Sequence, residues 1–198
     1  MCSAWRETEL DGRWEMGELR SPAIRIDAES VGNPGSPLDP RAVPSHESRV
    51  TSHQFMLEAL RLAREAADAT DVPVGAVVVR NGEIIGRGSN RTVRDQDPTA
   101  HAEMLAIREA ARTLGTWRLE GCELFVTLEP CAMCAGAIVL ARLDRVTFGA
   151  WDEKAGMAGS VGDLLRHPRL NHRPEVVAGV MARECGAPLE AFFAERRA

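Results

Sequence analysis

The sequence predicts an α/β protein, a three-layer α/β/α sandwich in which helices cover both faces of a five-stranded mixed sheet. From about residue 52 onward, segments with apolar residues at helical spacing alternate with short runs rich in β-branched residues. Turn signals separate these segments, and Asn81-Gly82 between two apolar runs is typical of a type I′ hairpin. The expected order is α-β-β-α-β-α-β-β-α, without an internal repeat.

The periodic segments give the expected boundaries, and two residues suggest how helices begin. Thr99 is a candidate N-cap for the second helix, and Pro130 stands where the third helix opens, a position that favours proline. The expected helices span about 52–69, 100–114, 130–141 and 182–197, with a short one near 163–166. The expected strands span about 74–80, 84–88, 123–128, 145–149 and 175–180.

Residues 1–50 differ in composition from the rest of the chain. Serine, proline, glycine and charged residues dominate, and no helical or strand period persists. Such a segment buries too little apolar surface to offset the entropy lost on ordering. We therefore expect a disordered extension over residues 1–50, followed by a single catalytic domain over residues 51–198. We expect this extension to be dispensable. A translation start near Val50 is the alternative explanation for its composition.

Composition and charge narrow the function classes. The 198 residues are 44% hydrophobic and carry a formal net charge of −5, so bulk charge gives no support to nucleic-acid binding, which would need a local patch. No apolar run approaches the roughly 20 residues of a membrane span, and no secretory signal precedes the domain. Five cysteines in a chain of this length do not form a disulfide framework. The expected compartment is the cytoplasm.

Two motifs carry the chemistry: His101-Ala-Glu103 and Pro130-Cys131-Ala-Met-Cys134. Cysteines at positions i and i+3 of a helix share a face and can bind one ion. The positive end of the helix favours the thiolate form that a metal requires. With His101 as the third ligand, the set is Cys₂His with an open position for water, the arrangement of a catalytic zinc. We expect one Zn²⁺ per chain.

Glu103 distinguishes this hypothesis from its alternatives. A carboxylate in the first turn of the helix can take a proton from the activated water and return it to a leaving nitrogen. A closed structural zinc site, with His172 or Cys185 as fourth ligand, has no use for Glu103. A thioredoxin-like redox pair is disfavoured because Ala-Met separates the cysteines and no Trp-Cys precedes them. The two motifs together are typical of zinc nucleobase deaminases.

Beyond these motifs, residues 52–197 resemble the bacterial tRNA-specific adenosine deaminase family, which has a cytidine deaminase-like fold. Residues 1–50 match nothing in that family. The resemblance rests on residues 72–79, 90–91, 97–103, 126–137, 148–150, 152, 159–160, 167–168, 171–173 and 192–193.

The resemblance implies hydrolysis of adenosine to inosine at the wobble position of a tRNA anticodon, with tRNA-Arg as the expected substrate, and a homodimer. It also implies that His101, Cys131 and Cys134 bind zinc while Glu103 transfers protons. For substrate binding it implies these residues: Asn90, Pro73 and Val74 at the base, Asp152 at the sugar, and Asn171, His172, Arg173, Phe193 and Arg196 at the anticodon loop.

Several of these substrate residues also have a structural interpretation. Asn90 could simply end a strand, Pro73 and Val74 could begin one, and Asp152 could be a surface carboxylate. Phe192 or Phe193 could belong to the core. Trp151 stands where many members carry a polar residue, the Lys-rich tail of some members is missing, and the chain has no tyrosine. These departures predict weaker or differently distributed RNA contacts.

Two other functions remain open at this point. A deaminase of a free base or nucleoside, such as guanine or cytosine, would share the fold but would not need the basic and aromatic segments 171–173 and 192–197. A catalytically silent RNA-binding subunit would not need Glu103. An assay of zinc content and activity separates the second alternative from an enzyme.

Overall fold

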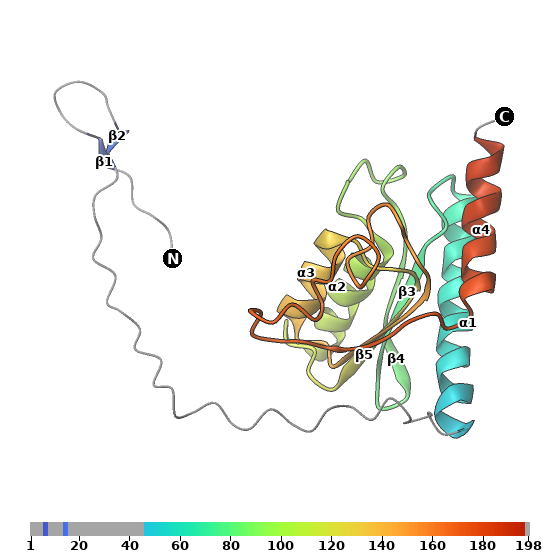
Figure 1. The fold of residues 1–198 in the computed structure, drawn as a ribbon, viewed down its shortest axis with the longest axis horizontal. Helices are drawn as coiled ribbons and strands as arrows, with labels where there is room; N and C mark the ends of the chain where they lie inside the picture. The colour runs from blue at the N-terminus through green and yellow to red at the C-terminus, as the bar shows by residue number, and fades with distance from the viewer. Residues whose placement is uncertain (1–5, 8–13, 16–45, 197–198) are drawn as a thin grey trace. The chain divides into compact units, whose positions relative to one another are not determined.

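The computed structural model describes residues 6–7, 14–15 and 46–196 (Figure 1). The chain divides between Ala42 and Val43 into two units. In the first, β1 (Arg6–Glu7) pairs antiparallel with β2 (Trp14–Glu15). We predicted disorder over residues 1–50, and most of that segment lies outside the described residues. Its last residues, from His46, belong to the first helix. No helix in the described ranges is long and apolar enough to cross a membrane.

The second unit confirms the predicted three-layer α/β/α sandwich with a five-stranded mixed sheet. Its strands are ordered β4-β3-β5-β6-β7. Pairing is antiparallel between β3 and both of its neighbours, and parallel from β5 to β6 and from β6 to β7. The helices are α1 (His46–Asp68), α2 (Ala102–Leu114), α3 (Ala132–Ala141) and α4 (Ala182–Glu195), and the strands are β3 (Gly75–Arg80), β4 (Glu83–Ser89), β5 (Cys122–Leu128), β6 (Arg145–Ala150) and β7 (Glu175–Val177).

The strand directions bring several loops to one edge of the sheet. Because β3 is antiparallel to both β4 and β5, the latter two run in the same direction, and β6 is parallel to β5. The carboxyl ends of β4, β5 and β6 therefore meet at one edge, where β3 begins. Ligand sites of open α/β sheets form at such an edge.

The helices cover the sheet in pairs, with α1 and α4 on one face and α2 and α3 on the other (Figure 1). The larger core lies between the sheet and the second pair, and includes Val78, Leu124, Ile138 and Phe148. Burial of these side chains provides the main stabilising free energy, about 25 cal/mol per Å² of apolar surface.

Two glycines of β4 allow α2 to pack directly on the strand backbone. A β-carbon added to Gly88 would lie 2.0 Å from the carbonyl oxygen of Ala102, and one added to Gly86 would lie 2.3 Å from that of Ala106. Since both distances are far below contact distance, any larger residue would push α2 away. This close approach fixes where α2 begins, next to the end of β4.

The hairpin prediction is confirmed, because Asn81 and Gly82 both have positive φ angles, 51° and 80°, as a type I′ turn requires. The predicted start of the first helix, near residue 52, was too late, since α1 begins at His46. Its polar first residues carry no apolar period from which the earlier start could be predicted. The prediction of a short helix near residues 163–166 is wrong. A turn forms there, in which the Arg166 amide donates to Asp163 Oδ1.

The two predicted helix starts were also wrong. The N-cap of α2 is His101, and the Thr99 hydroxyl instead donates to Asp97 Oδ1 at 2.7 Å. The N-cap of α3 is Cys131, so Pro130 precedes the cap rather than opening the helix. In both cases a candidate metal ligand occupies the cap position.

Candidate active site

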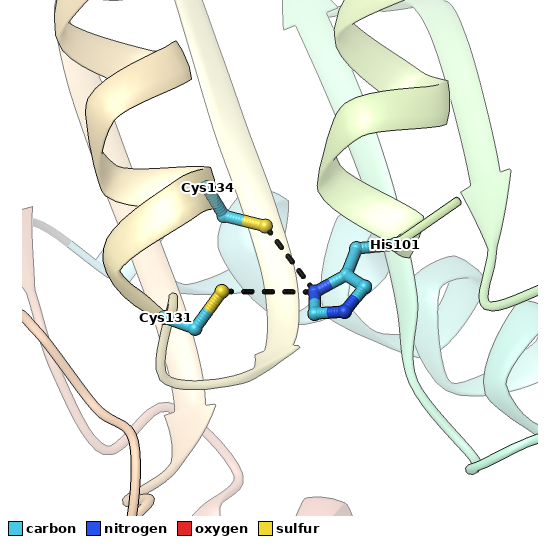
Figure 2. A group of neighbouring side chains, drawn as sticks. All are labelled: His101, Cys131 and Cys134. Atoms are coloured by element: carbon cyan, nitrogen blue, oxygen red, sulfur yellow. Dashed lines mark hydrogen bonds between the residues drawn. The ribbon is translucent and has the colours of Figure 1, made fainter. Parts of the chain in front are cut away.

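Three side chains with metal-ligand chemistry converge where α2 and α3 begin (Figure 2). His101 Nδ1 lies 3.7 Å from Cys131 Sγ and 3.5 Å from Cys134 Sγ. A tetrahedral zinc with Zn–S of about 2.3 Å and Zn–N of about 2.0 Å places nitrogen and sulfur about 3.5 Å apart. The donor atoms are thus already spaced as zinc requires, and they leave one coordination position free.

The local backbone explains why these side chains meet. His101 and Cys131 have extended φ and ψ angles (−74° and 151°, −72° and 177°), and their carbonyl groups accept the first helical hydrogen bonds, from Leu105 and Ala135. Each side chain therefore lies beside the positive end of its helix, which stabilises thiolate. Cys134, fully buried in the first turn of α3, faces the same point.

The electrostatics of this cluster also favour a metal. Hydrogen bonds, first from the Cys134 thiol and then from His101, lower the pKa of Cys131 to about 3, although burial opposes the shift. The hydrogen bond with Cys131 raises the pKa of His101. Donation to Cys131, together with burial, raises the pKa of Cys134. The cluster therefore favours a thiolate at Cys131, and binding of a divalent cation releases the protons of its ligands.

Glu103 lies in the first turn of α2 and is almost completely buried, with 3% of its surface exposed. Burial raises the pKa of its carboxyl group. Within residues 52–196, its Oε2 atom has no hydrogen-bond partner. A buried carboxyl with a free oxygen and a raised pKa is suited to accept a proton and return it.

Glu103, His101 and Cys131 share the wall of a cavity of about 180 Å³. The cavity lies at the sheet edge where β3 begins and where β4, β5 and β6 end, so four chain segments contribute to it. They supply Val72 and Val74 before β3, Asn90 and Thr92 after β4, Leu128 and Glu129 at the end of β5, and Asp152 and Ala155 after β6.

The structure brings some of the sequence-predicted substrate residues to this cavity. Asn90, Val74 and Asp152 line it. Pro73 is buried between Val72 and Val74 and is not among the lining residues. Sequence reasoning missed Val72, whose place in an apolar strand start gave no signal beyond burial.

The predicted segment 171–173 does not line the cavity. The Asn171 side chain accepts a hydrogen bond from Arg142 at 3.0 Å, and His172 Nε2 donates to the Leu143 carbonyl at 2.6 Å. These bonds attach the segment to the carboxyl end of α3, opposite the end that holds Cys131. Arg173 is exposed.

The predicted residues of α4 also lie outside the cavity wall. Phe193 is 41% exposed and Phe192 half-buried, so neither belongs to the described core. Arg196 donates to the Thr70 carbonyl at 2.9 Å, and its guanidinium lies 3.5 Å from the centre of the Phe192 ring. Phe193 thus offers an aromatic surface, whereas Arg196 is held by its own chain.

Glu129 is a functional candidate that sequence reasoning missed, although it stands next to Pro130-Cys131. Its buried carboxylate accepts hydrogen bonds from the amides of Asp152, Ala158 and Ser160 at 2.9–3.1 Å, and from the Ser160 hydroxyl. Burial raises the pKa of Glu129, but these hydrogen bonds outweigh it and the pKa lies below its usual value. The ionised carboxylate fastens the loop after β6 over the cavity.

Replacement of Glu129 by alanine is expected to lower the free energy of unfolding by on the order of 3 kcal/mol, because three backbone amides lose a charged acceptor. Urea denaturation measures this loss. The control is Glu153→Ala, an exposed residue of the same loop, for which a change within about 0.5 kcal/mol is expected. A loss at Glu129 no larger than the control's would show that the carboxylate does not hold the loop.

Comparison with known proteins agrees with this geometry. The family model described as the cytidine and deoxycytidylate deaminase zinc-binding region matches residues 49–150. The tRNA-specific adenosine deaminase of Bacillus subtilis (strain 168) is 54% identical over 143 residues, which cover 72% of this chain and 89% of that protein.

Solved structures show the same fold. One, from a study of A-to-I editing by tRNA:A34 deaminases at the wobble position of transfer RNA, is 44% identical with a TM-score of 0.67, covering 69% of this chain and 99% of that one. A guanine deaminase from Nitrosomonas europaea is 25% identical with a TM-score of 0.63, covering 79% and 89%. The chain therefore belongs to the zinc-binding deaminase family that includes the tRNA-specific adenosine deaminases.

Proposed function

We propose that this chain hydrolyses the 6-amino group of the wobble adenosine in a tRNA anticodon, giving inosine and ammonia. The observation that carries the proposal is the buried Glu103 carboxyl beside the His101, Cys131 and Cys134 donor set, at a cavity that Asn90 also lines. The similarity to tRNA-specific adenosine deaminases supports adenosine in RNA over a free base.

The candidate metal ligands and three of the cavity residues have roles in this reaction. His101, Cys131 and Cys134 hold zinc, which when bound supplies the Lewis acidity that activates water. Glu103 takes a proton from the attacking water and delivers it to the leaving nitrogen. The Asn90 side chain binds a polar edge of the base, and Val74 contributes an apolar wall.

The remaining contacts concern the nucleotide and its neighbours. We assign buried Pro73, next to Val74, to the base wall, and Asp152, which lines the cavity, to the sugar. We assign Phe193, Arg196 and the segment Asn171–Arg173, with His172, to the anticodon loop outside the cavity. Exposure of Phe193 and Arg173 supports this assignment. The side chains of Asn171, His172 and Arg196 already make hydrogen bonds within the chain. We therefore assign them smaller contributions to RNA binding.

Steric access explains why an anticodon loop suits this site. The cavity of about 180 Å³ accommodates a base only after that base leaves its stack. Unpaired loop bases can be splayed out at low free-energy cost, and aromatic or arginine side chains then stack on their neighbours. A duplex would have to lose pairing as well as stacking.

A tRNA-Arg anticodon stem-loop with adenosine at the wobble position is therefore expected to be converted to inosine, with free adenosine, cytidine and guanine as poor substrates. Nucleoside analysis of digested RNA measures the conversion, and the same stem-loop with guanosine at that position is the control. Efficient turnover of free guanine, with the stem-loop left unconverted, would refute the tRNA substrate. It would indicate a guanine deaminase, like the structural relative from Nitrosomonas europaea.

We also propose a homodimer. The helix α3 is apolar on more faces than the core requires, since Leu140 is 72% exposed and Met133 and Ala137 are only half-buried. An apolar helix face of this kind is typical of an interface. Light scattering is expected to give twice the chain mass of 21.6 kDa, and a monomer mass at micromolar concentration would contradict the dimer.

The domain and its compartment complete the proposal. Residues 51–198 form the deaminase domain, although α1 already begins at His46, so a truncated protein should start no later than that residue. Cytoplasmic location is supported by the thiol ligands Cys131 and Cys134, which must stay reduced to bind zinc.

A further inference from the structure

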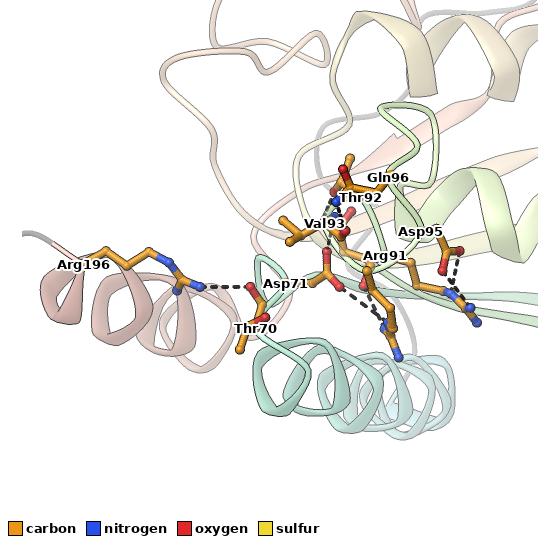
Figure 3. A network of polar contacts seen from close by, with 10 residues as sticks. Thr70, Asp71, Arg91, Thr92, Val93, Asp95, Gln96 and Arg196 are labelled. Atoms are coloured by element: carbon orange, nitrogen blue, oxygen red, sulfur yellow. Dashed lines mark hydrogen bonds and ion pairs between the residues drawn. The ribbon is translucent and has the colours of Figure 1, made fainter.

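Asp71 is a fully buried carboxylate that the sequence motifs did not single out. It lies between α1 and β3, and its amide donates to the Ala66 carbonyl at the end of the helix. Its side chain faces the loop of residues 91–97, which connects β4 to α2 (Figure 3). We call residues 91–97 the β4–α2 loop.

Both carboxylate oxygens of Asp71 contact this loop. Oδ1 accepts a hydrogen bond from the Val93 amide at 2.7 Å, and Oδ2 lies 3.5 Å from Nε of Arg94. Among residues 52–196, no group donates a hydrogen bond to Oδ2. A buried carboxylate with one ion partner has a high desolvation free energy. Its charge is therefore poorly explained by stability alone.

The same contacts continue to the cavity wall. Nη2 of Arg94 donates to the carbonyl of Asn90 at 3.3 Å, so one guanidinium joins Asp71 to the backbone of Asn90. The Asn90 side-chain amide donates in turn to Thr92 Oγ1 at 2.9 Å, and Thr92 adjoins the anchored Val93. Asn90 and Thr92 both line the cavity.

We propose that Asp71 is a positioning residue which, through Val93 and Arg94, fixes the β4–α2 loop and so directs the Asn90 amide toward the substrate base. The proposal rests on the proposed function, because it takes Asn90 as a base-binding residue. It adds that the geometry of Asn90 depends on a charge outside the cavity. Displacement of a binding group by about 1 Å is sufficient to reduce a reaction rate severely.

The neighbouring ion pair between Arg91 and Asp95 provides a matched control. Nε and Nη2 of Arg91 donate to Asp95 at 2.8 and 2.9 Å, within the same loop. Both side chains are substantially exposed, and in the described part of the chain neither side chain hydrogen-bonds to Asn90 or Thr92. Loss of this pair removes an ion pair from the loop and leaves the hydrogen bonds and the ion pair that join Asp71 to Asn90 in place. Arg91 keeps its longer-range electrostatic interaction with Asp71.

The decisive experiment compares Asp71→Asn, Asn90→Ala and the double variant, with Asp95→Asn as control, on the anticodon stem-loop. Asp71→Asn keeps an oxygen for the Val93 amide but removes the charge. We expect a loss of about tenfold or more in kcat/KM, carried mostly by KM, with one zinc per chain retained. In the Asn90→Ala background the same change should cost less than about twofold, as expected for coupled residues.

A second readout does not need the reaction. The side-chain amide resonance of Asn90, assigned by its disappearance in Asn90→Ala, should shift in Asp71→Asn and stay in place in Asp95→Asn. Arg94→Lys keeps the positive charge but loses the second donor to the Asn90 carbonyl, and should give the same shift if Asp71→Asn does not fold.

Independent losses in the double variant, or an unmoved Asn90 resonance in both Asp71→Asn and Arg94→Lys, would overturn the proposal. If the wild-type chain does not convert the stem-loop, the proposed function fails instead. The resonance then decides alone whether Asp71 positions Asn90.

Discussion

Replacement of Glu103 by glutamine is expected to reduce deamination by about 10²–10⁴-fold while zinc stays at one ion per chain. The substitution preserves size in a fully enclosed position, so the fold should be retained. What it removes is the ability to accept a proton and return it. Steady-state kinetics on the anticodon stem-loop measure the loss, and elemental analysis measures the metal.

The matched control is Glu190→Gln, an exposed residue of α4 that should leave both quantities unchanged. Glu103→Ala should behave like Glu103→Gln, since neither removes a ligand. Loss of zinc from either Glu103 variant would show that the carboxylate coordinates the metal, and would contradict its assignment as a proton carrier.

Replacement of Cys134 by alanine should abolish both zinc binding and activity. Cys134 is one of only three donors in the cluster, and removal of outer partners alone typically costs 10–100-fold in metal affinity. We expect a larger loss here, together with a lower melting temperature, because bound metal stabilises the folded state. Cys185→Ala is the control, since Cys185 is equally buried but lies outside the cluster. Retention of stoichiometric zinc in Cys134→Ala would contradict the ligand set.

The sequence predicted the candidate metal ligands from two short motifs. Cys131 and Cys134 are three residues apart at a helix start, so their shared face follows from local spacing. His101 lies 30 residues earlier, and its place beside them followed from the motif pair that is typical of zinc nucleobase deaminases. The fold class followed from short-range apolar periods and turn dipeptides. The comparisons then confirmed the family that the motif pattern indicated.

The supporting carboxylates could not be predicted, because their partners are distant in sequence. Glu129 binds amides 23 to 31 residues further along, and Asp71 contacts a loop 22 residues away. No spacing rule relates such positions. The same limit applies to Asn171 and His172, whose bonds to the end of α3 are visible only in three dimensions.

The two carboxylates have a common physical effect. Glu129 fastens the loop after β6, which carries Asp152, and Asp71 fastens the β4–α2 loop, next to Asn90. Each lies against the protein interior, where a charge interacts more strongly than at the surface. The cavity is thus bounded by two loops that buried carboxylates help to hold in place.

The most direct test of the central claim is deamination of the wobble-adenosine stem-loop by the zinc-loaded protein in oxygen-18-labelled water. Mass spectrometry of the released nucleosides should show inosine with one heavy oxygen at C6 and equimolar ammonia, with none formed by Glu103→Gln. Absence of inosine, or inosine that carries no oxygen from the solvent, would contradict hydrolytic deamination of the wobble adenosine by this site.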